Sequence, residues 1–328
     1  MEIVVTSGNA IAFVKQGKKT TLLNQEKYKP CQFCVTKEIG SAKRSTLRLS
    51  QVHRVVVMVL MMDERIPEPI RPFLQDYIRL LGQQMGDLWQ ACYLYGSIAL
   101  GAFNERMSDI DFITVLGRNP TSSDIVQLQA IHQSLQIAYP RWTLDESYLQ
   151  WHDFGCLPDV VIPYPYVAQG IFHQKGYRDL NLVTWWVLKH HGIAIVGSSP
   201  QTLSFTVSWD ELIARMYENL NSYWLSWTRT PTRLAQLLTD YGIQWAVLGI
   251  LRLWYAFREN AIASKTQAGR YALAHLSNRW HLLIQEAINL RDHPEHRLYT
   301  CRLHRNYDAV KFLHYMIRLC NEQARSSP

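Results

Sequence analysis

The sequence predicts a mixed-sheet α/β (α+β) domain followed by an all-α helical bundle, and three observations support this division. Between residues 63 and 208, short apolar runs suited to strands alternate with amphipathic segments suited to helices. From Trp209 onward, apolar and aromatic residues recur at helical spacing throughout. Residues 1–62 fit neither pattern. We therefore expect a basic N-terminal extension at 1–62, a sheet domain at 63–208 and a helical domain at 209–328.

Charge and cysteine content limit the partners and the compartment that we expect. Residues 1–60 hold ten Lys and Arg residues against three Asp and Glu residues, and this excess accounts for the whole net charge of +7. Because residues 61–328 are neutral, they lack the basic stripes that contacts to nucleic-acid phosphates require. Six scattered cysteines do not form a disulfide framework, and no apolar run is long enough to span a bilayer. We expect a cytoplasmic protein without a nucleic-acid or membrane partner.

The N-terminal segment shows no long amphipathic period. We interpret it as a loose extension, or as the product of an overextended reading frame with a true start at Met61 or Met62. Cys31 and Cys34 form a C-x-x-C pair, but no second pair or neighbouring histidines accompany it. Chance spacing is therefore favoured over a zinc site.

The expected elements of the sheet domain follow one another at short intervals. Three prolines between residues 67 and 72 suit the first turn of a helix that ends near Gly86. Strands are expected at 93–95 and 112–116, on either side of a polar turn. The remaining elements are a helix at 122–138 with Ser122 or Ser123 as N-cap, a strand at 142–150, a helix at 180–191 stopped by Gly192, and a strand at 193–196.

The helical domain is expected to pack against the sheet domain, with the active site in the cleft between them. Its dense Trp and Tyr residues, spaced at the helical period, are typical of a core. The helices are predicted at 209–227, 231–256, 265–276, 280–290 and 308–325.

Residues 93–116 carry the most informative pattern of the chain. An apolar run ends in Gly96 and Ser97, and after a polar turn Asp109 and Asp111 enter a second apolar run. Side chains two apart in a strand point to the same face, so the two carboxylates would project together. Their mutual repulsion favours a cation between them, and hard oxygen ligands suit Mg²⁺ carrying nucleotide phosphates. A Gly-Ser turn lets backbone N–H groups approach those phosphates.

A lone D-x-D or G-S is usually a surface turn with solvated charge. The order of strand, Gly-Ser, turn, Ser-Asp-x-Asp and strand is more specific, and it resembles the nucleotidyltransferase superfamily that includes DNA polymerase β. Within that superfamily the chain is most similar to bacterial aminoglycoside O-adenylyltransferases of the streptomycin/spectinomycin (3''/9) type, from about Arg65 to about Arg291. The resemblance implies a nucleotidyltransferase domain at 63–208 and a domain at 209–328 that closes over substrate and nucleotide. It also implies ATP as co-substrate and two Mg²⁺ ions.

The resemblance further implies a third carboxylate on a neighbouring strand, which ligates metal and serves as general base. The segment Leu-Asp-Glu-Ser-Tyr at 144–148 matches the family pattern and places this acid at Asp145. The family usually has Glu at this position, one methylene longer. Glu146 remains the alternative, because a slip of one residue in register exchanges the faces of the two side chains.

Lys265 lies in a segment that resembles the family's I-x-x-K motif, whose lysine reaches the nucleotide phosphates. It is one of four lysines after residue 60, and a solvated lysine at a helix start is the alternative. Arg252 and Tyr255 lie on the preceding family helix, as cleft residues or as packing. Glu286 matches a family position with a structural role.

The acceptor site is the least readable part of the sequence. Aminoglycosides are polycations, which need carboxylates and aromatic faces in the cleft. Trp224 lies where the family carries an aromatic drug contact, and Asp240 lies near a family acidic contact, across a gap in the alignment. Glu218 is another possibility. The acidic pair associated with streptomycin recognition is not clearly preserved, so the drug stays open.

Our leading hypothesis is a monomeric enzyme that transfers AMP from Mg–ATP to a hydroxyl of an aminoglycoside or aminocyclitol. A second hypothesis keeps the chemistry but changes the acceptor to a protein or another small molecule. A third is a non-catalytic module that binds nucleotide or drug, although such a module would not need to keep three acids.

Overall fold

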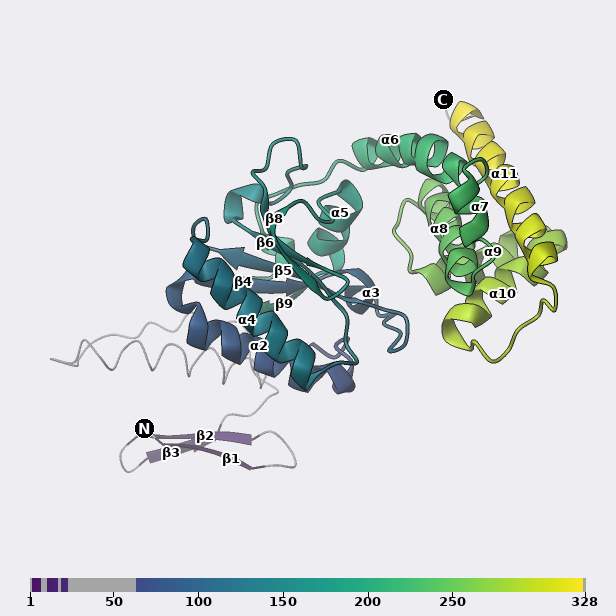
Figure 1. Cartoon of the computed structure of the whole chain (residues 1–328). Helices are drawn as coiled ribbons and strands as arrows, with labels where there is room; N and C mark the ends of the chain where they lie inside the picture. The colour runs from purple at the N-terminus through teal and green to yellow at the C-terminus, as the bar shows by residue number, and fades with distance from the viewer. Residues whose placement is uncertain (1, 7–10, 17–18, 23–62, 327–328) are drawn as a thin grey trace. The chain divides into compact units, whose positions relative to one another are not determined.

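The structure is a computed structural model and describes residues 2–6, 11–16, 19–22 and 63–326 (Figure 1). The chain divides into two compact units, residues 1–62 and 63–328. In the first unit, β1 (Glu2–Thr6), β2 (Ile11–Gln16) and β3 (Lys19–Leu22) form an antiparallel sheet in the order β1-β2-β3. The sequence pattern predicts none of these strands. The Cys31–Cys34 pair and the proposed starts at Met61 and Met62 lie outside the described residues.

The second unit begins with a mixed sheet, as the sequence predicts, but the sheet has six strands, and the two at 164–168 and 171–176 are not predicted. Its strand order is β8-β7-β6-β5-β4-β9, in which β5 and β6 run parallel and all other neighbours run antiparallel. The strands are β4 (Trp89–Leu94), β5 (Ile110–Leu116), β6 (Leu144–Leu149), β7 (Tyr164–Ala168), β8 (Ile171–Gly176) and β9 (Ile193–Val196).

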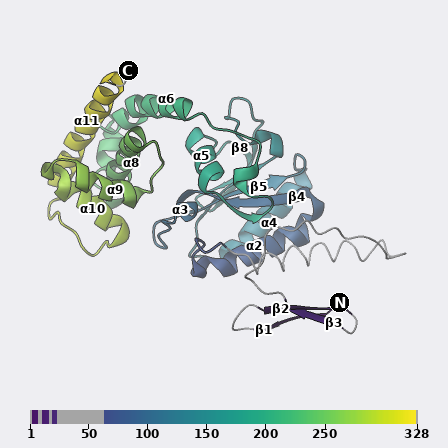
Figure 2. The ribbon, with the colours of Figure 1, turned by 180° about the vertical axis from the view of Figure 1, so that it is seen from behind.

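Helices cover both faces of this sheet (Figures 1 and 2). On one face, α2 (Arg71–Gln84) and α4 (Ser122–Ala138) pack against each other, and Phe112 of β5 points towards them. On the other face, α5 (Leu182–His191) contributes Trp185 to a core shared with Ile113 of β5. Successive β5 side chains therefore alternate between two helical layers, which fixes the face on which Asp111 lies.

The connection from β5 to β6 runs through α4, because two parallel strands need a crossover. The predicted N-cap at Ser122 or Ser123 is wrong, because the N-cap residue is Thr121. The Thr121 hydroxyl caps the helix by accepting the Asp124 N–H at 3.3 Å, and the Asp124 carboxylate accepts the Thr121 N–H in return. The helix covers residues 122–138, as predicted, and the reciprocal capping box changes only the residue that caps it.

The helical domain has the predicted all-α character, with three differences in the helix boundaries. The first helix passes into a π-helical turn at Leu220–Trp224, and the second is interrupted before Thr239, whose hydroxyl caps a new helix by accepting the Gly242 N–H. The last helix begins at Arg302, six residues before the prediction. The helices are α6 (Trp209–Asn219), α7 (Pro231–Gln236), α8 (Asp240–Glu259), α9 (Lys265–His275), α10 (His281–Asp292) and α11 (Arg302–Ser326).

Short helical segments connect the larger elements. One of them, α3 (Gly96–Ala99), follows β4 directly and packs against α5. Single 3₁₀ turns lie at Glu68–Ile70, Gly86–Leu88, Trp151–Asp153, Pro200–Thr202 and Asn278–Trp280. None of the helices in the described residues is long and apolar enough to cross a bilayer.

Candidate active site

Three of the predicted carboxylates gather at one end of the parallel strand pair. Asp111 of β5 lies in register with Asp145 of β6, and Asp109 precedes β5 on the same side. Burial, followed by repulsion from Asp145, Asp179 and Asp109, raises the pKa of Asp111 well above its usual range. Burial and Asp145 likewise raise the pKa of Asp109. Such a group of acids is stabilised when a cation neutralises it.

The Gly-Ser turn is built around the Asp111 carboxylate. Gly96 has a φ of +60°, and a Cβ on this residue would lie 1.9 Å from Asp111 Oδ2. The backbone N–H of Ser97 donates to Asp111, which favours the charged carboxylate. The Ser97 hydroxyl is buried without a hydrogen-bond partner. The turn thus leaves one polar group beside the acids that is available to a ligand.

Gly96→Ala is expected to lower kcat by about 10²-fold, because the added methyl must displace the Asp111 carboxylate from its place. Gly86→Ala is the matched control, since Gly86 has a similar φ of +52° but open space around its Cβ position. Both changes strain the backbone. A kinetic comparison that finds equal loss in the two variants would attribute the effect to strain alone.

Both oxygens of Asp145 have partners within the protein. The Gln169 N–H donates to Oδ1, and the Arg178 guanidinium donates to Oδ2. Glu146 points to the opposite face of the sheet, where the Tyr77 hydroxyl donates to it and His132 Nε2 lies 3.2 Å away. The register therefore brings Asp145, and not Glu146, beside Asp111.

Arg178 and Asp179 belong to this cluster, although the sequence analysis does not select them. They lie in the connection between β8 and α5, and Arg178 pairs with Asp145 across 33 positions of sequence. Asp179 has a φ of +54°, and burial is the main cause that raises its pKa. No motif marks either residue, so only the folded chain reveals them.

Lys265 is the first residue of α9 and faces the acids from the helical domain. Burial, with Arg291 and Arg252 nearby, lowers its pKa to about 8, and Asp109 and Asp111 act in the opposite direction. The ammonium lies 4.6 Å from the centre of the Trp245 ring. A buried cation that faces a group of carboxylates is suited to an anionic ligand with bound metal.

Two arginines accompany Lys265. Arg252 Nε donates to the Ala263 carbonyl at 2.9 Å, and Arg291 donates to the Ser108 hydroxyl at 2.9 Å. The Asn104 amide donates to the Arg291 carbonyl at 3.0 Å. The two bonds of Arg291 join the turn before Asp109 to α10 of the helical domain. Arg252 lines a cavity together with Lys265, and its role as a cleft residue stays a prediction.

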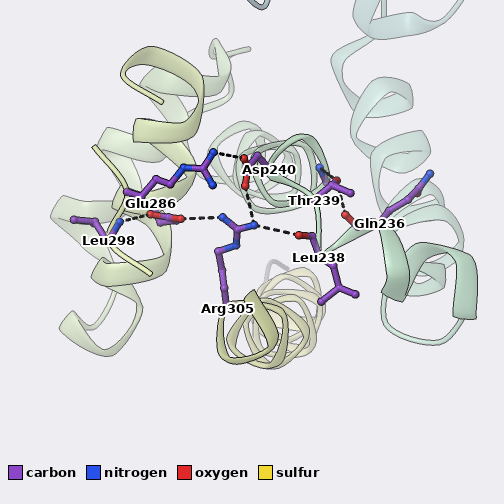
Figure 3. A network of polar contacts seen from close by, with 9 residues as sticks. Gln236, Leu238, Thr239, Asp240, Glu286, Leu298 and Arg305 are labelled. Carbon is purple, nitrogen blue, oxygen red and sulfur yellow. Dashed lines mark hydrogen bonds and ion pairs between the residues drawn. The ribbon is translucent and has the colours of Figure 1, made fainter. Parts of the chain in front are cut away.

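The two predicted acceptor residues have partners of their own. Trp224 is buried against α8, where a Cβ on Gly249 would lie 2.2 Å from its ring, and its edge reaches a cavity of about 140 Å³ lined also by Lys265. Asp240 forms ion pairs with Arg297 at 2.7 Å and with Arg305 at 2.9 Å (Figure 3). These contacts favour structural roles, and drug contact by either residue stays a prediction.

Tyr241, which follows Asp240, is an exposed aromatic residue near the acids that the sequence analysis misses. Its ring stacks on Trp245 with the ring centres 5.7 Å apart. Partial burial and the Asp109 carboxylate raise its pKa. Position alone distinguishes it from the many aromatic core residues of this domain. Glu218, the remaining acidic candidate, is exposed and pairs with Arg215.

A larger cavity of about 580 Å³ lies beside the start of α9. Its walls come from the segment after α3 and from the helical domain, and its polar lining includes Asn104, Ser264, Thr266, Arg270 and Asp292. This volume is in the range of pockets that hold small ligands.

Comparisons with known proteins agree with this architecture. The crystal structure of spectinomycin adenyltransferase AAD(9) from Enterococcus faecialis, with ATP and spectinomycin, aligns with a TM-score of 0.56 at 12% sequence identity. The alignment covers 75% of this chain and 98% of that one. Residues 222–318 match the family model described as aminoglycoside adenylyltransferase, C-terminal domain. No curated protein matches the chain.

The mixed sheet with its helical partner domain is the fold of a nucleotidyltransferase, and the chain is an enzyme of this class. Residues 222–318 match the C-terminal domain of the aminoglycoside adenylyltransferase family. This match agrees with the family that the sequence resembles.

Proposed function

We propose that the enzyme transfers AMP from Mg–ATP to a hydroxyl of an aminoglycoside or aminocyclitol antibiotic and releases pyrophosphate. The observation that carries the proposal is the meeting of Asp109, Asp111 and Asp145 with Lys265 of the helical domain. The family match and the AAD(9) fold, whose crystal structure holds ATP and spectinomycin, support the same activity.

The carboxylate cluster fits a divalent cation. Its donors are oxygens, which Mg²⁺ prefers, and burial and mutual repulsion raise the pKa of both Asp109 and Asp111. The unpartnered Ser97 hydroxyl lies at the same turn. Asp109, Asp111 and Asp145 would hold up to two ions. When bound, Mg²⁺ would neutralise the triphosphate and the charge that develops at the α-phosphorus.

Basic side chains of the helical domain suit the nucleotide. Lys265 and Arg252 would bind the phosphates, since both lie close to the carboxylates from the other wall of the site. The cavity of about 580 Å³ begins at Ser264 and Thr266, next to Lys265, and would take the nucleoside. Asp145 would accept the proton of the acceptor hydroxyl as general base.

The antibiotic that accepts AMP would bind next to the aromatic residues Tyr241 and Trp245. Tyr241 and Trp245 offer stacked ring faces near Asp109, and cationic rings of an aminocyclitol bind favourably to aromatic faces beside carboxylates. Spectinomycin and streptomycin are the first acceptors to test.

The deciding experiment incubates the purified protein with ATP, Mg²⁺ and a panel of aminoglycosides and aminocyclitols. Mass spectrometry is expected to find a product that is heavier by one AMP, which disappears with EDTA and with Asp109→Asn. If every antibiotic stays unmodified while a protein or another small molecule gains AMP, the acceptor class is wrong. If ATP is not consumed under any condition, transfer itself is wrong.

The pH profile provides a test of Lys265. Because its pKa is lowered to about 8, its positive charge is present below that pH and is lost above it. The value of kcat/KM for ATP, which reports groups of the free enzyme, is expected to fall as the pH rises through about 8. Lys265→Arg should remove this fall, because a guanidinium stays charged. An unchanged profile in the variant would assign the titration to another group.

A further inference from the structure

The backbone of Arg178 is fixed on both sides of the residue. The Tyr164 hydroxyl accepts the Arg178 N–H at 2.7 Å and donates to the Arg178 carbonyl at 2.8 Å. The Ser147 hydroxyl donates to the same carbonyl at 3.0 Å. Ser147 lies two positions after Asp145 in β6, so the main chain of Arg178 is tied to the strand that carries the candidate base.

The side chain of Arg178 lies between two acids. It donates to Asp145 Oδ2, while its Nε lies 3.2 Å from Asp179 Oδ2, outside hydrogen-bond geometry. This Nε is therefore a buried donor without a hydrogen-bond partner. The Asp145 side chain is 5% exposed, and its other oxygen is taken by the Gln169 N–H. The guanidinium thus covers the oxygen of Asp145 that the protein does not otherwise bind.

We propose that Arg178 is an exchangeable counter-ion: it neutralises Asp145 in the nucleotide-free enzyme and moves to the triphosphate when metal and ATP bind. The inference rests on the proposed function, since it assumes that Asp145 serves the metal–nucleotide site. A cation at the carboxylates competes with the guanidinium for the same oxygen and repels it. A phosphate offers the planar fork of Arg178 two acceptors, including one for the unpartnered Nε.

A purely structural role of Arg178 predicts a different result for the binding of metal alone. If Arg178 only stabilises the β8–α5 connection, its removal loosens the site, and both the metal and the metal–nucleotide complex bind more weakly. If it is exchanged, removal of its charge strengthens binding of metal alone and weakens binding of the nucleotide. The two effects then have opposite signs.

The experiment compares wild type with Arg178→Met and Arg178→Lys. Mn²⁺ alone is titrated with detection by electron paramagnetic resonance, and Mn²⁺ with α,β-methylene-ATP is titrated by calorimetry. In Arg178→Met we expect the Kd of Mn²⁺ to fall about tenfold, because a competing charge is removed. The Kd of the nucleotide should rise about tenfold, because a charge-assisted bidentate contact is lost. Arg178→Lys should restore part of the nucleotide affinity and keep the wild-type Kd of Mn²⁺.

Arg79→Met is the matched control, because Arg79 is an exposed arginine of α2 that also pairs with an aspartate, Asp76. It should leave both constants unchanged. Effects of the same sign in Arg178→Met, or no effect, would overturn the proposal. Should Arg178→Met fail to fold, as judged by its melting curve, a nucleotide affinity of Arg178→Lys equal to wild type would overturn it as well.

The antibiotic panel separates this inference from the proposed function. If the Kd values of Mn²⁺ and nucleotide change in opposite directions but no antibiotic is modified, the counter-ion role of Arg178 stands and the proposed acceptor is wrong. If AMP is transferred to an antibiotic but the two Kd values change in the same direction, the proposed function stands and the counter-ion role is wrong.

Discussion

Asp111→Asn is expected to lower kcat for AMP transfer by about 10³-fold or more and, at the same time, to raise the melting temperature of the metal-free protein. The loss would follow from the proposed role of Asp111 as a metal ligand, since a metal ion contributes several kcal/mol of charge stabilisation to such a reaction. The higher melting temperature follows because the Asp111 carboxylate is buried beside three other acids, all of which raise its pKa. Asparagine carries no charge at this place.

The sign of the stability effect depends on pH. Because the pKa of Asp111 is raised in the folded protein, its favourable contribution is complete below the unfolded value of about 3.9 and is lost as the pH rises through the folded value. The advantage of the Asn variant should therefore be largest near neutral pH and should disappear in acid. Melting curves between pH 4 and pH 8, with and without Mg²⁺, measure it, and Mg²⁺ should stabilise wild type only.

Asp76→Asn is the control for this prediction. Asp76 lies on α2, and its pKa is lowered by the Tyr139 hydroxyl and by Arg79, so loss of its charge should slightly destabilise the protein and leave kcat unchanged. Retention of more than about a tenth of the activity in Asp111→Asn would contradict the metal assignment. A lower melting temperature at neutral pH would contradict the repulsion between the acids.

The second large effect concerns stability. Arg305→Met is expected to reduce the free energy of unfolding by about 3–5 kcal/mol, because it leaves the Glu286 carboxylate buried without its cation. Arg305 is 2% exposed and Glu286 is fully buried, with their atoms 3.0 Å apart. Glu286 also accepts the Leu298 N–H at 2.7 Å, and Arg305 reaches the Leu238 carbonyl at 3.3 Å (Figure 3).

Urea denaturation measures this loss, and a double variant identifies its cause. Arg305→Met with Glu286→Leu removes both charges at similar volume, and it should recover most of the stability, since an apolar pair often replaces a buried ion pair without cost. If the double variant is as unstable as the single one, packing around Arg305 and not the unpaired acid is responsible. If the single variant loses less than about 1 kcal/mol, the network does not stabilise the domain.

The fold class could be predicted from the sequence because short apolar runs correspond to strands in the structure and longer amphipathic segments correspond to helices. It does not decide between Asp145 and Glu146, and the reason is physical. All six residues of β6 are buried, because helices or neighbouring loops cover both faces of the strand. A strand buried on both sides shows no alternation of polar and apolar residues from which its face could be read.

The start of α11 and the contact between Arg178 and Asp145 could not be predicted from sequence patterns either. The start of α11 is missed because most residues of its first turn are exposed, so the apolar period begins only later. The residue that this turn buries is Arg305, and its partner Glu286 lies in another helix. Arg178 reaches Asp145 through a loop conformation fixed by Tyr164. Both depend on contacts between distant segments, which spacing along the chain does not encode.

The single parallel pair of the six-stranded sheet also sets the order in which the site can assemble during synthesis. Asp111 leaves the ribosome before the crossover helix α4, and Asp145 follows only after it. The repulsion between these acids therefore cannot arise until the crossover closes, and from then on a divalent ion that binds both strands favours the closed state by mass action. A divalent ion held by the proposed site would therefore stabilise the closed crossover while the chain folds.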